Sequence, residues 1–110
     1  MRRGDIVTVA AGGGYDGKPR PAVIVQLDAF AATASVTVCL LTRRGIDAPL
    51  LRLPLTPSHG NGLTAPSWIM VDKVVTVPRA KVGSRVGSLL AVDVARLNRA
   101  LAVFLAIAGA

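Results

Sequence analysis

Two short runs of branched apolar residues constrain this chain more than any other feature. Residues 21–27 (PAVIVQL) and 35–42 (SVTVCLLT) are both bounded by segments that favour turns and loops. Apolar runs of this length that are rich in valine and isoleucine predict buried, central strands. Residues 4–10 (GDIVTVA) are short and β-branched and predict a further strand. We therefore expect the first half of the chain to form a sheet.

The second half of the chain mixes loops, strands and a helix. Residues 50–55 (LLRLPL) contain Pro54, which is typical of an edge strand or of a strand end. Residues 57–67 (PSHGNGLTAPS) favour a loop, and residues 68–78 (WIMVDKVVTVP) predict an extended segment. From Ser88 onward the apolar spacing predicts a helix with Ser88 as its N-cap. The apolar stripe consists of Leu90, Val94, Leu97, Leu101, Phe104 and Leu105, and the opposite face carries Asp93, Arg96 and Arg99.

These elements predict a mainly β fold with a C-terminal helix. Five or six short strands followed by one helix favour a small, strongly bent sheet or barrel that the helix covers. A chain of 110 residues without a linker, repeat or low-complexity segment predicts a single domain, residues 1–110. The most apolar stretch, ALAVFLAIAGA, is shorter than the roughly 20 residues that span a bilayer. We expect a cytoplasmic protein without a membrane partner.

The charge of the chain favours a polyanionic partner. Thirteen Lys and Arg residues against six Asp and Glu residues give a formal net charge of +7. In a small domain, an excess of this size favours nucleic acid, an anionic membrane surface or an acidic protein as partner. A surface that is basic only for solubility is the alternative.

Most sequence motifs for catalysis or metal binding are absent. The GGG at residues 12–14 lacks the lysine and hydroxyl of a phosphate-binding loop. One histidine and one cysteine cannot build a typical zinc site, and the acidic residues show no ligand spacing. The lone Cys39 lies in an apolar run and is predicted to be a small buried hydrophobe. We therefore predict neither a metal nor another cofactor.

Arg20 stands out in the stretch GKPRPAVIV. Pro19 and Pro21 restrict the backbone on both sides and hold Arg20 extended at the entrance of the predicted strand. A guanidinium can bind a phosphate through two parallel hydrogen bonds and stays charged at any relevant pH. Arg20 is therefore a candidate phosphate ligand, and a solvated arginine before a strand is the alternative.

Thr42, His59 and Asp72 are further candidates. Thr42 ends a predicted strand, where its hydroxyl can reach a phosphate oxygen while Arg43 and Arg44 add positive charge; a solvated turn is the alternative. His59 can shuttle protons near neutral pH, or it is an exposed loop histidine without a task. Asp72 interrupts an apolar strand and can position an arginine or form a structural ion pair.

Five segments, taken in order, resemble the MazF/PemK/Kid family of bacterial toxins. They are MRRGDIVTV, RPAVIVQ, VCLLT, WIMVDKVVTV and KVGSRVGSLLAVDVARLNRAL, and they cover nearly the whole chain. The resemblance implies a small SH3-like barrel of the CcdB/MazF/PemK type with a C-terminal helix, working as a homodimer. It also implies the toxin of a type II toxin–antitoxin system, which cleaves single-stranded RNA without a metal. A cognate antitoxin, expected to be an acidic and partly disordered chain, would hold it inactive.

The resemblance also assigns roles to individual residues. The arginine of the RP motif falls on Arg20 and the strand-end threonine on Thr42, and these are the catalytic positions of the family. An aspartate that some members use falls on Asp72, whereas Met70 stands where some members carry an arginine, and Lys73 where glutamine is usual. The residues expected to contact RNA are Lys18, Arg43, Arg44, Asp72 and Lys73, with His59 as a possible proton shuttle.

The implied reaction uses a nucleophile that RNA itself carries. The 2′-hydroxyl attacks the adjacent phosphorus and leaves a 2′,3′-cyclic phosphate and a 5′-hydroxyl, while Arg20 stabilises charge and Thr42 orients a non-bridging oxygen. Two alternatives stay open: a CcdB-like inhibitor of DNA gyrase on the same barrel, and a nucleic-acid-binding barrel without catalysis. Such inhibitors often carry a tryptophan near the end of the final helix, whereas the only tryptophan here is Trp68.

Overall fold

The computed structural model describes residues 1–10 and 18–107, and within them it confirms a mainly β fold with a C-terminal helix. The strands are β1 (Asp5–Ala10), β2 (Pro19–Ile24), β3 (Ser35–Thr42), β4 (Arg52–Leu55), β5 (Ser67–Pro78) and β6 (Val82–Ser88). Two 3-10 turns, η1 (Asp28–Phe30) and η2 (Arg79–Lys81), and the helix α1 (Ala91–Phe104) complete the elements. The GGG at residues 12–14 lies outside the described residues.

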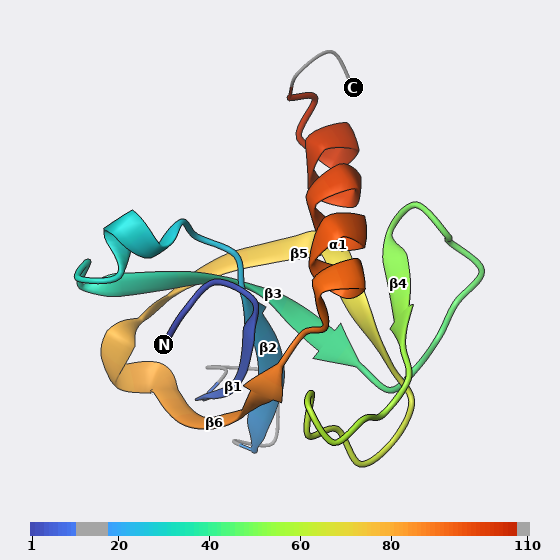
Figure 1. Ribbon diagram of the computed structural model, residues 1–110. Helices are drawn as coiled ribbons and strands as arrows, with labels where there is room; N and C mark the ends of the chain where they lie inside the picture. The colour runs from blue at the N-terminus through green and yellow to red at the C-terminus, as the bar shows by residue number, and fades with distance from the viewer. Residues whose placement is uncertain (11–17, 108–110) are drawn as a thin grey trace.

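All six strands belong to one sheet with the order β4-β5-β3-β2-β1-β6, and the described pairs are antiparallel (Figure 1). The two buried, central strands predicted from the sequence, β2 and β3, indeed lie in the middle of this order. The short β4 with Pro54 lies at one end, as expected for an edge strand. In the described residues β4 and β6 are not paired with each other, so closure of the sheet into a barrel stays a prediction.

The sheet buries apolar side chains on both of its faces. One cluster joins the sheet to α1, through Leu97 and Leu101 of the helix, and α1 packs against β5 and β4. The second cluster draws all of its members from strands, with Val7, Val9 and Val38 among those that are buried. Because no helix contributes to this second cluster, the strands themselves must curl around it to exclude water.

The N-cap of the helix lies two residues later than predicted. Ser88 is the last residue of β6, a strand that the sequence did not indicate, and α1 follows Leu90 as the residue before the helix. The Ser88 hydroxyl donates a hydrogen bond to Asp5 Oδ1 at 2.7 Å, so the predicted N-cap role of Ser88 is wrong. The apolar stripe is buried only at its centre, at Leu97 and Leu101, while its ends are exposed.

The RGD segment at residues 3–5 stabilises the fold through Asp5. Asp5 is buried and accepts hydrogen bonds from the backbone N–H of Arg2 (2.8 Å) and from the hydroxyl of Ser88, with the Arg85 guanidinium 3.5 Å away. Burial raises the pKa of Asp5, but these hydrogen bonds and the charge of Arg85 outweigh it, so the pKa lies below 3.8. The carboxylate therefore ties the N-terminal turn to β6.

A single asparagine organises the loop before β5. Asn61 is buried, and its side chain accepts the backbone N–H groups of Ser58 and Leu63 and donates to the carbonyl of Thr56. The backbone N–H of Ser88 in β6 donates to the carbonyl of Gly60, which attaches the loop to the sheet. The SHGNG stretch is thus a loop, as predicted, but one held by internal hydrogen bonds.

None of the helices in the described part of the chain has the length and apolar character needed to cross a membrane.

Candidate active site

Arg20 and Thr42 line the same cavity. It has a volume of about 440 Å³ and lies between β2 and the end of β3. The described residues that line it are Lys18, Pro19, Arg20, Pro21, Leu41, Thr42, Arg43 and Ser67. Three of these carry a positive charge and none is an Asp or Glu, so the cavity favours an anion.

The cavity opens where the ladder between β2 and β3 ends. The pairs Ile24 with Val38, Val23 with Cys39 and Ala22 with Leu40 form this ladder. Continued by two residues, the same register sets position 20 opposite position 42, on one face of the sheet. Proline has no N–H to donate, which fits the absence of described β2–β3 pairs at Pro19 and Pro21.

Arg20 lies inside a strand and not ahead of it. β2 begins at Pro19, two residues earlier than predicted, and Arg20 pairs with Val9 of β1. The prediction that Arg20 stands at the mouth of the strand is therefore wrong, although its extended backbone is confirmed. This stretch pairs with β1 on one side and diverges from β3 on the other, so it lies along the wall of the cavity.

The Thr42 hydroxyl is held by the turn that follows β3. The backbone N–H of Arg44 donates to Thr42 Oγ1 at 3.1 Å. This bond occupies an acceptor position of the hydroxyl, whose own hydrogen can still be donated to an oxygen of a bound anion. Arg43 lies beside it in the lining, and its guanidinium donates to the hydroxyl of Thr64 at 3.0 Å. Arg44 contributes through its backbone and is not among the lining residues.

The remaining sequence candidates lie elsewhere. Asp72 and Lys73 of β5 and His59 of the loop at residues 57–67 do not line the cavity of Arg20 and Thr42. His59 is exposed. The structure thus brings Lys18, Arg20, Thr42 and Arg43 together and leaves the two acid–base candidates outside.

Asp72 has an arginine partner that the sequence did not reveal. Arg52 on β4 forms an ion pair with Asp72, and Arg52 is the direct cross-strand neighbour of Met70. Burial raises the pKa of Asp72, but the hydrogen bond and charge of Arg52 outweigh it, so the pKa lies below 3.8. A guanidinium from the neighbouring strand therefore stands beside the position where Met70 supplies none. The arginine within LLRLPL was the only signal for it, and the strand pairing was needed to interpret it.

Cys39 lies in the core and away from this cavity. It is fully buried, and burial raises the pKa of its thiol to about 11, as suits the small hydrophobe that was predicted. Among the described residues no group of three or more His, Cys, Asp or Glu side chains is placed to hold a metal ion.

The amino-acid sequence is similar to those of known proteins. The family described as the PemK-like, MazF-like toxins of type II toxin–antitoxin systems matches residues 2–105. A protein of Mycolicibacterium smegmatis named "Probable endoribonuclease MazF" is 56% identical over 109 residues, which are 99% of this chain and 100% of that protein.

Solved structures share the fold. A mycobacterial endoribonuclease in complex with its cognate antitoxin superposes with a TM-score of 0.77 at 25% identity, covering 97% of this chain and 94% of that chain. The MazE–MazF structure from Deinococcus radiodurans (Form-III) has a TM-score of 0.80 at 19% identity and covers 98% of both chains. At that identity the second likeness concerns the fold alone.

Proposed function

Because the chain belongs to the PemK-like, MazF-like toxins of type II toxin–antitoxin systems, we propose that it is an endoribonuclease that cuts single-stranded RNA. One observation carries the site of this activity: Arg20 and Thr42 line one cavity, together with two further cations. The 56% identity to a protein named as a probable endoribonuclease supports the reaction class. The positive lining and the net charge of +7 support a polyanionic substrate.

The cleavage step needs positioning and charge stabilisation. The 2′-oxygen of the RNA attacks the adjacent phosphorus, the bond from phosphorus to the 5′-oxygen breaks, and the products are a 2′,3′-cyclic phosphate and a 5′-hydroxyl. The Arg20 guanidinium stabilises the charge that grows on the phosphorane oxygens, and the Thr42 hydroxyl donates to a non-bridging oxygen. Lys18 and Arg43 hold the flanking phosphates. In this proposal the reaction needs no metal, because the cations of the cavity neutralise the transition state.

Neither residue nominated for proton transfer fits a cavity base. His59 lies outside the lining residues, and the lowered pKa of Asp72, paired with Arg52, makes that carboxylate a weak base. We therefore assign His59 and Asp72 no step in the cavity. The 2′-proton and the proton that the 5′-oxygen takes up exchange with solvent or with groups outside the described residues.

The partners follow from the same family membership. We infer an acidic antitoxin that covers the basic surface of the toxin, a homodimeric assembly, and action in the cytoplasm, where RNA is available. The mycobacterial endoribonuclease that was solved in complex with its cognate antitoxin supports the first of these. We also propose that the curled sheet closes further, into an SH3-like barrel.

Removal of the Arg20 side chain tests the site. Arg20→Ala should lower the rate of RNA cleavage by about 100- to 1000-fold, as expected when a donor to a developing oxyanion is lost. Arg2→Ala is a matched control, because it removes the same side chain from a position that is 84% exposed. Both proteins are incubated with a long single-stranded RNA in EDTA, cleavage ends are mapped, and thermal unfolding verifies folding.

The outcomes separate the candidate functions. Defined cuts with 5′-hydroxyl ends that vanish only in Arg20→Ala support the proposal, and cleavage by that variant at near wild-type rate removes Arg20 from the site. Gyrase-dependent DNA breaks would instead indicate a CcdB-like inhibitor. An RNA mobility shift without cuts by the wild-type protein would indicate a binding barrel without catalysis.

A further inference from the structure

One row of paired residues crosses the sheet at Thr42. Thr42 pairs with Trp68 of β5, and Trp68 pairs with Pro54 of β4. Directly opposed residues of antiparallel strands project from the same face of a sheet. The register of β2 on β3, continued by two residues, sets Arg20 on the other side of Thr42. The only tryptophan of the chain therefore lies on the face of Arg20 and Thr42, one strand away from Thr42.

The indole of Trp68 packs against a glycine and stays partly exposed. Gly45 lies in the turn that follows β3, and a Cβ at that position would be 2.6 Å from Cζ2 and 2.7 Å from Cε2 of the indole. A side chain at position 45 would therefore push the turn and the ring apart. Trp68 is half-buried, so the ring that Gly45 contacts also presents surface to solvent.

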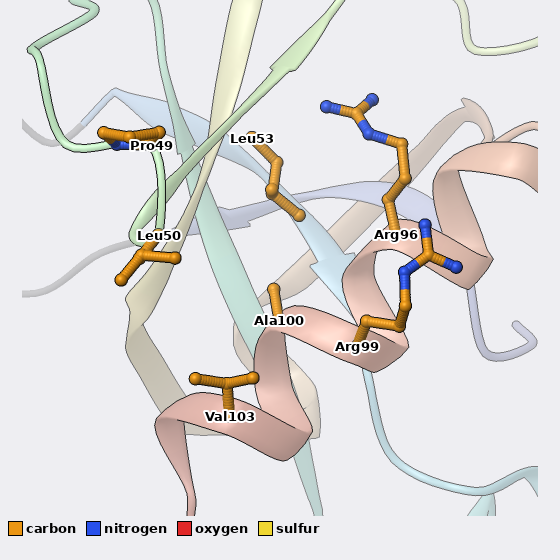
Figure 2. A pocket seen from close by; sticks show the side chains of 7 residues that line it. All are labelled: Pro49, Leu50, Leu53, Arg96, Arg99, Ala100 and Val103. Carbon is orange, nitrogen blue, oxygen red and sulfur yellow. The ribbon is translucent and has the colours of Figure 1, made fainter. Parts of the chain in front are cut away.

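The strand on the other side of Trp68 is tied to the helix. Arg96 projects from α1 (Figure 2), and its guanidinium donates to the carbonyl of Pro54 at 3.1 Å and to Asp93 Oδ1 at 2.8 Å. Asp93 and Arg96 therefore face β4, although they were predicted on the face opposite the apolar stripe. Because Pro54 is the cross-strand partner of Trp68, both neighbours of the indole, the turn and the edge strand, are held in place.

A partly exposed indole beside arginines suits single-stranded RNA. Proteins bind unpaired nucleotides by holding the phosphates with cations and by stacking the bases on aromatic side chains. Arg43 and Arg44 are exposed and lie in the chain between Thr42 and Gly45. The second pocket, of about 300 Å³ between α1 and the segment before β4, lacks this combination, because its described lining is aliphatic and basic without an aromatic ring (Figure 2).

We propose that one base of the RNA stacks on Trp68 while a neighbouring phosphate lies between Arg20 and Thr42. The identity of the ligand as RNA rests on the proposed function. Opposed residues in an antiparallel pair have Cα atoms about 5 Å apart, so a nucleotide held at Thr42 can set its base on Trp68. Every base has a face that can stack, whereas a base inside a duplex is already stacked. Trp68 therefore favours unpaired RNA over paired RNA.

Intrinsic fluorescence of the wild-type protein gives the first test. The chain has one tryptophan, so the tryptophan emission reports on Trp68 alone. The probe is a short single-stranded RNA with 2′-fluoro groups in place of the 2′-hydroxyls, which cannot be cut because it lacks the nucleophile. Its sequence comes from the mapped cuts, or from an RNA that the protein shifts if it makes none. Binding should quench the emission, and unchanged emission at saturating probe would overturn the proposal.

Probes that lack one base each identify the stacked base. With the wild type, removal of that base should weaken binding about 5- to 150-fold, the range that base–aromatic stacking spans. With Trp68→Leu the same removal should have no such effect, whereas Trp68→Phe keeps a ring and should retain most of it. Phe30→Leu is the matched control, because it replaces an aromatic side chain that is 58% exposed and outside the cavity lining.

Two other roles for Trp68 give different results. If the indole only fills space beside the turn, each missing base weakens binding equally in the wild type and in Trp68→Leu, and the proposal is overturned. If the indole belongs to an interface between two copies of the chain, Trp68→Leu dissociates in sedimentation whereas Phe30→Leu does not, which overturns it as well. Thermal unfolding verifies that the variants fold. Should Trp68→Leu not fold, Trp68→Phe and the quenching of the wild type decide.

RNA cleavage separates this proposal from the function. Trp68→Leu should raise KM and leave kcat nearly unchanged, because Trp68 is not among the residues that line the cavity of the reacting phosphate. A wild-type protein that cuts no RNA but loses affinity for one base through Trp68 would contradict the proposed function and leave the stacking site standing. Cleavage at defined sites without any dependence on Trp68 would do the opposite.

Discussion

Replacing Asn61 with alanine should lower the free energy of unfolding by about 3 kcal/mol. The side chain is 1% exposed and makes three hydrogen bonds of 2.9 to 3.0 Å, to the backbone of Ser58, Leu63 and Thr56. Alanine leaves two backbone donors and one acceptor without these partners, and each such loss costs about 1 kcal/mol. With an unfolding entropy of about 2.1 cal/mol/K per residue, a loss of about 3 kcal/mol lowers the Tm of 110 residues by about 13 °C.

Thermal and urea unfolding, followed by circular dichroism, measure this loss. Asn98→Ala is the matched control, because Asn98 is exposed on α1 and alanine is the better helix former. All proteins are compared at one concentration, since the stability of the proposed homodimer would depend on it. A difference of about 0.5 kcal/mol is typical of surface substitutions. If the free energies of unfolding of Asn61→Ala and Asn98→Ala differ by no more than that, the reasoning about the loop is refuted.

Three further changes test other parts of the molecule. The pKa of Asp5 is lowered in the folded protein, so its carboxylate stabilises the fold above the unfolded-state pKa, and this stabilisation is lost as the pH falls through the folded-state pKa. In urea unfolding, the free energy of unfolding should therefore fall more steeply with acid for the wild type than for Asp5→Asn. Equal slopes would contradict this prediction. Gly62→Ala should destabilise by more than about 1 kcal/mol, because φ is +69° and a Cβ would clash with the carbonyl oxygen of Val86. Gly60→Ala is its control, since the nearest atoms to a Cβ there lie at 3.9 Å, an ordinary contact distance, and an equal loss in thermal unfolding would refute the argument. Cys39, buried and with its pKa raised to about 11, should react with a thiol reagent only after unfolding; fast labelling of the native protein in an absorbance assay would count against this.

The sequence predicted strands well where apolar residues were dense. β3 has the predicted bounds, because a run such as SVTVCLLT favours one conformation strongly. β6 (VGSRVGS) was missed because its glycines remove the pattern. The structure explains Gly83 and Gly87: a Cβ would clash with the Thr8 hydroxyl at the first and with the Asn61 carbonyl at the second. Close approaches of this kind depend on tertiary contacts that local spacing does not encode.

For the candidate site, too, features that depend on local sequence were predicted and those that depend on tertiary contacts were not. Arg20 and Thr42 were found from local chemistry and the family resemblance, and the structure places both in one cavity. The Arg52–Asp72 ion pair joins residues twenty positions apart, and only the register of β4 on β5 brings them together. His59 was nominated for its imidazole chemistry alone, without information on its position, and it lies outside the lining of the cavity.

The Pro-Arg-Pro segment has a consequence for how such a site can evolve. Pro19 and Pro21 keep β2 from pairing with the end of β3 because they lack a backbone donor, and this is a property of the main chain. The gap between the two strands therefore does not depend on the side chains at positions 18 and 43, which line the cavity. If the proposed function holds, substitutions at those two positions should change which RNA is preferred while the gap between the strands persists. A toxin built in this way would change its targets without rebuilding its fold.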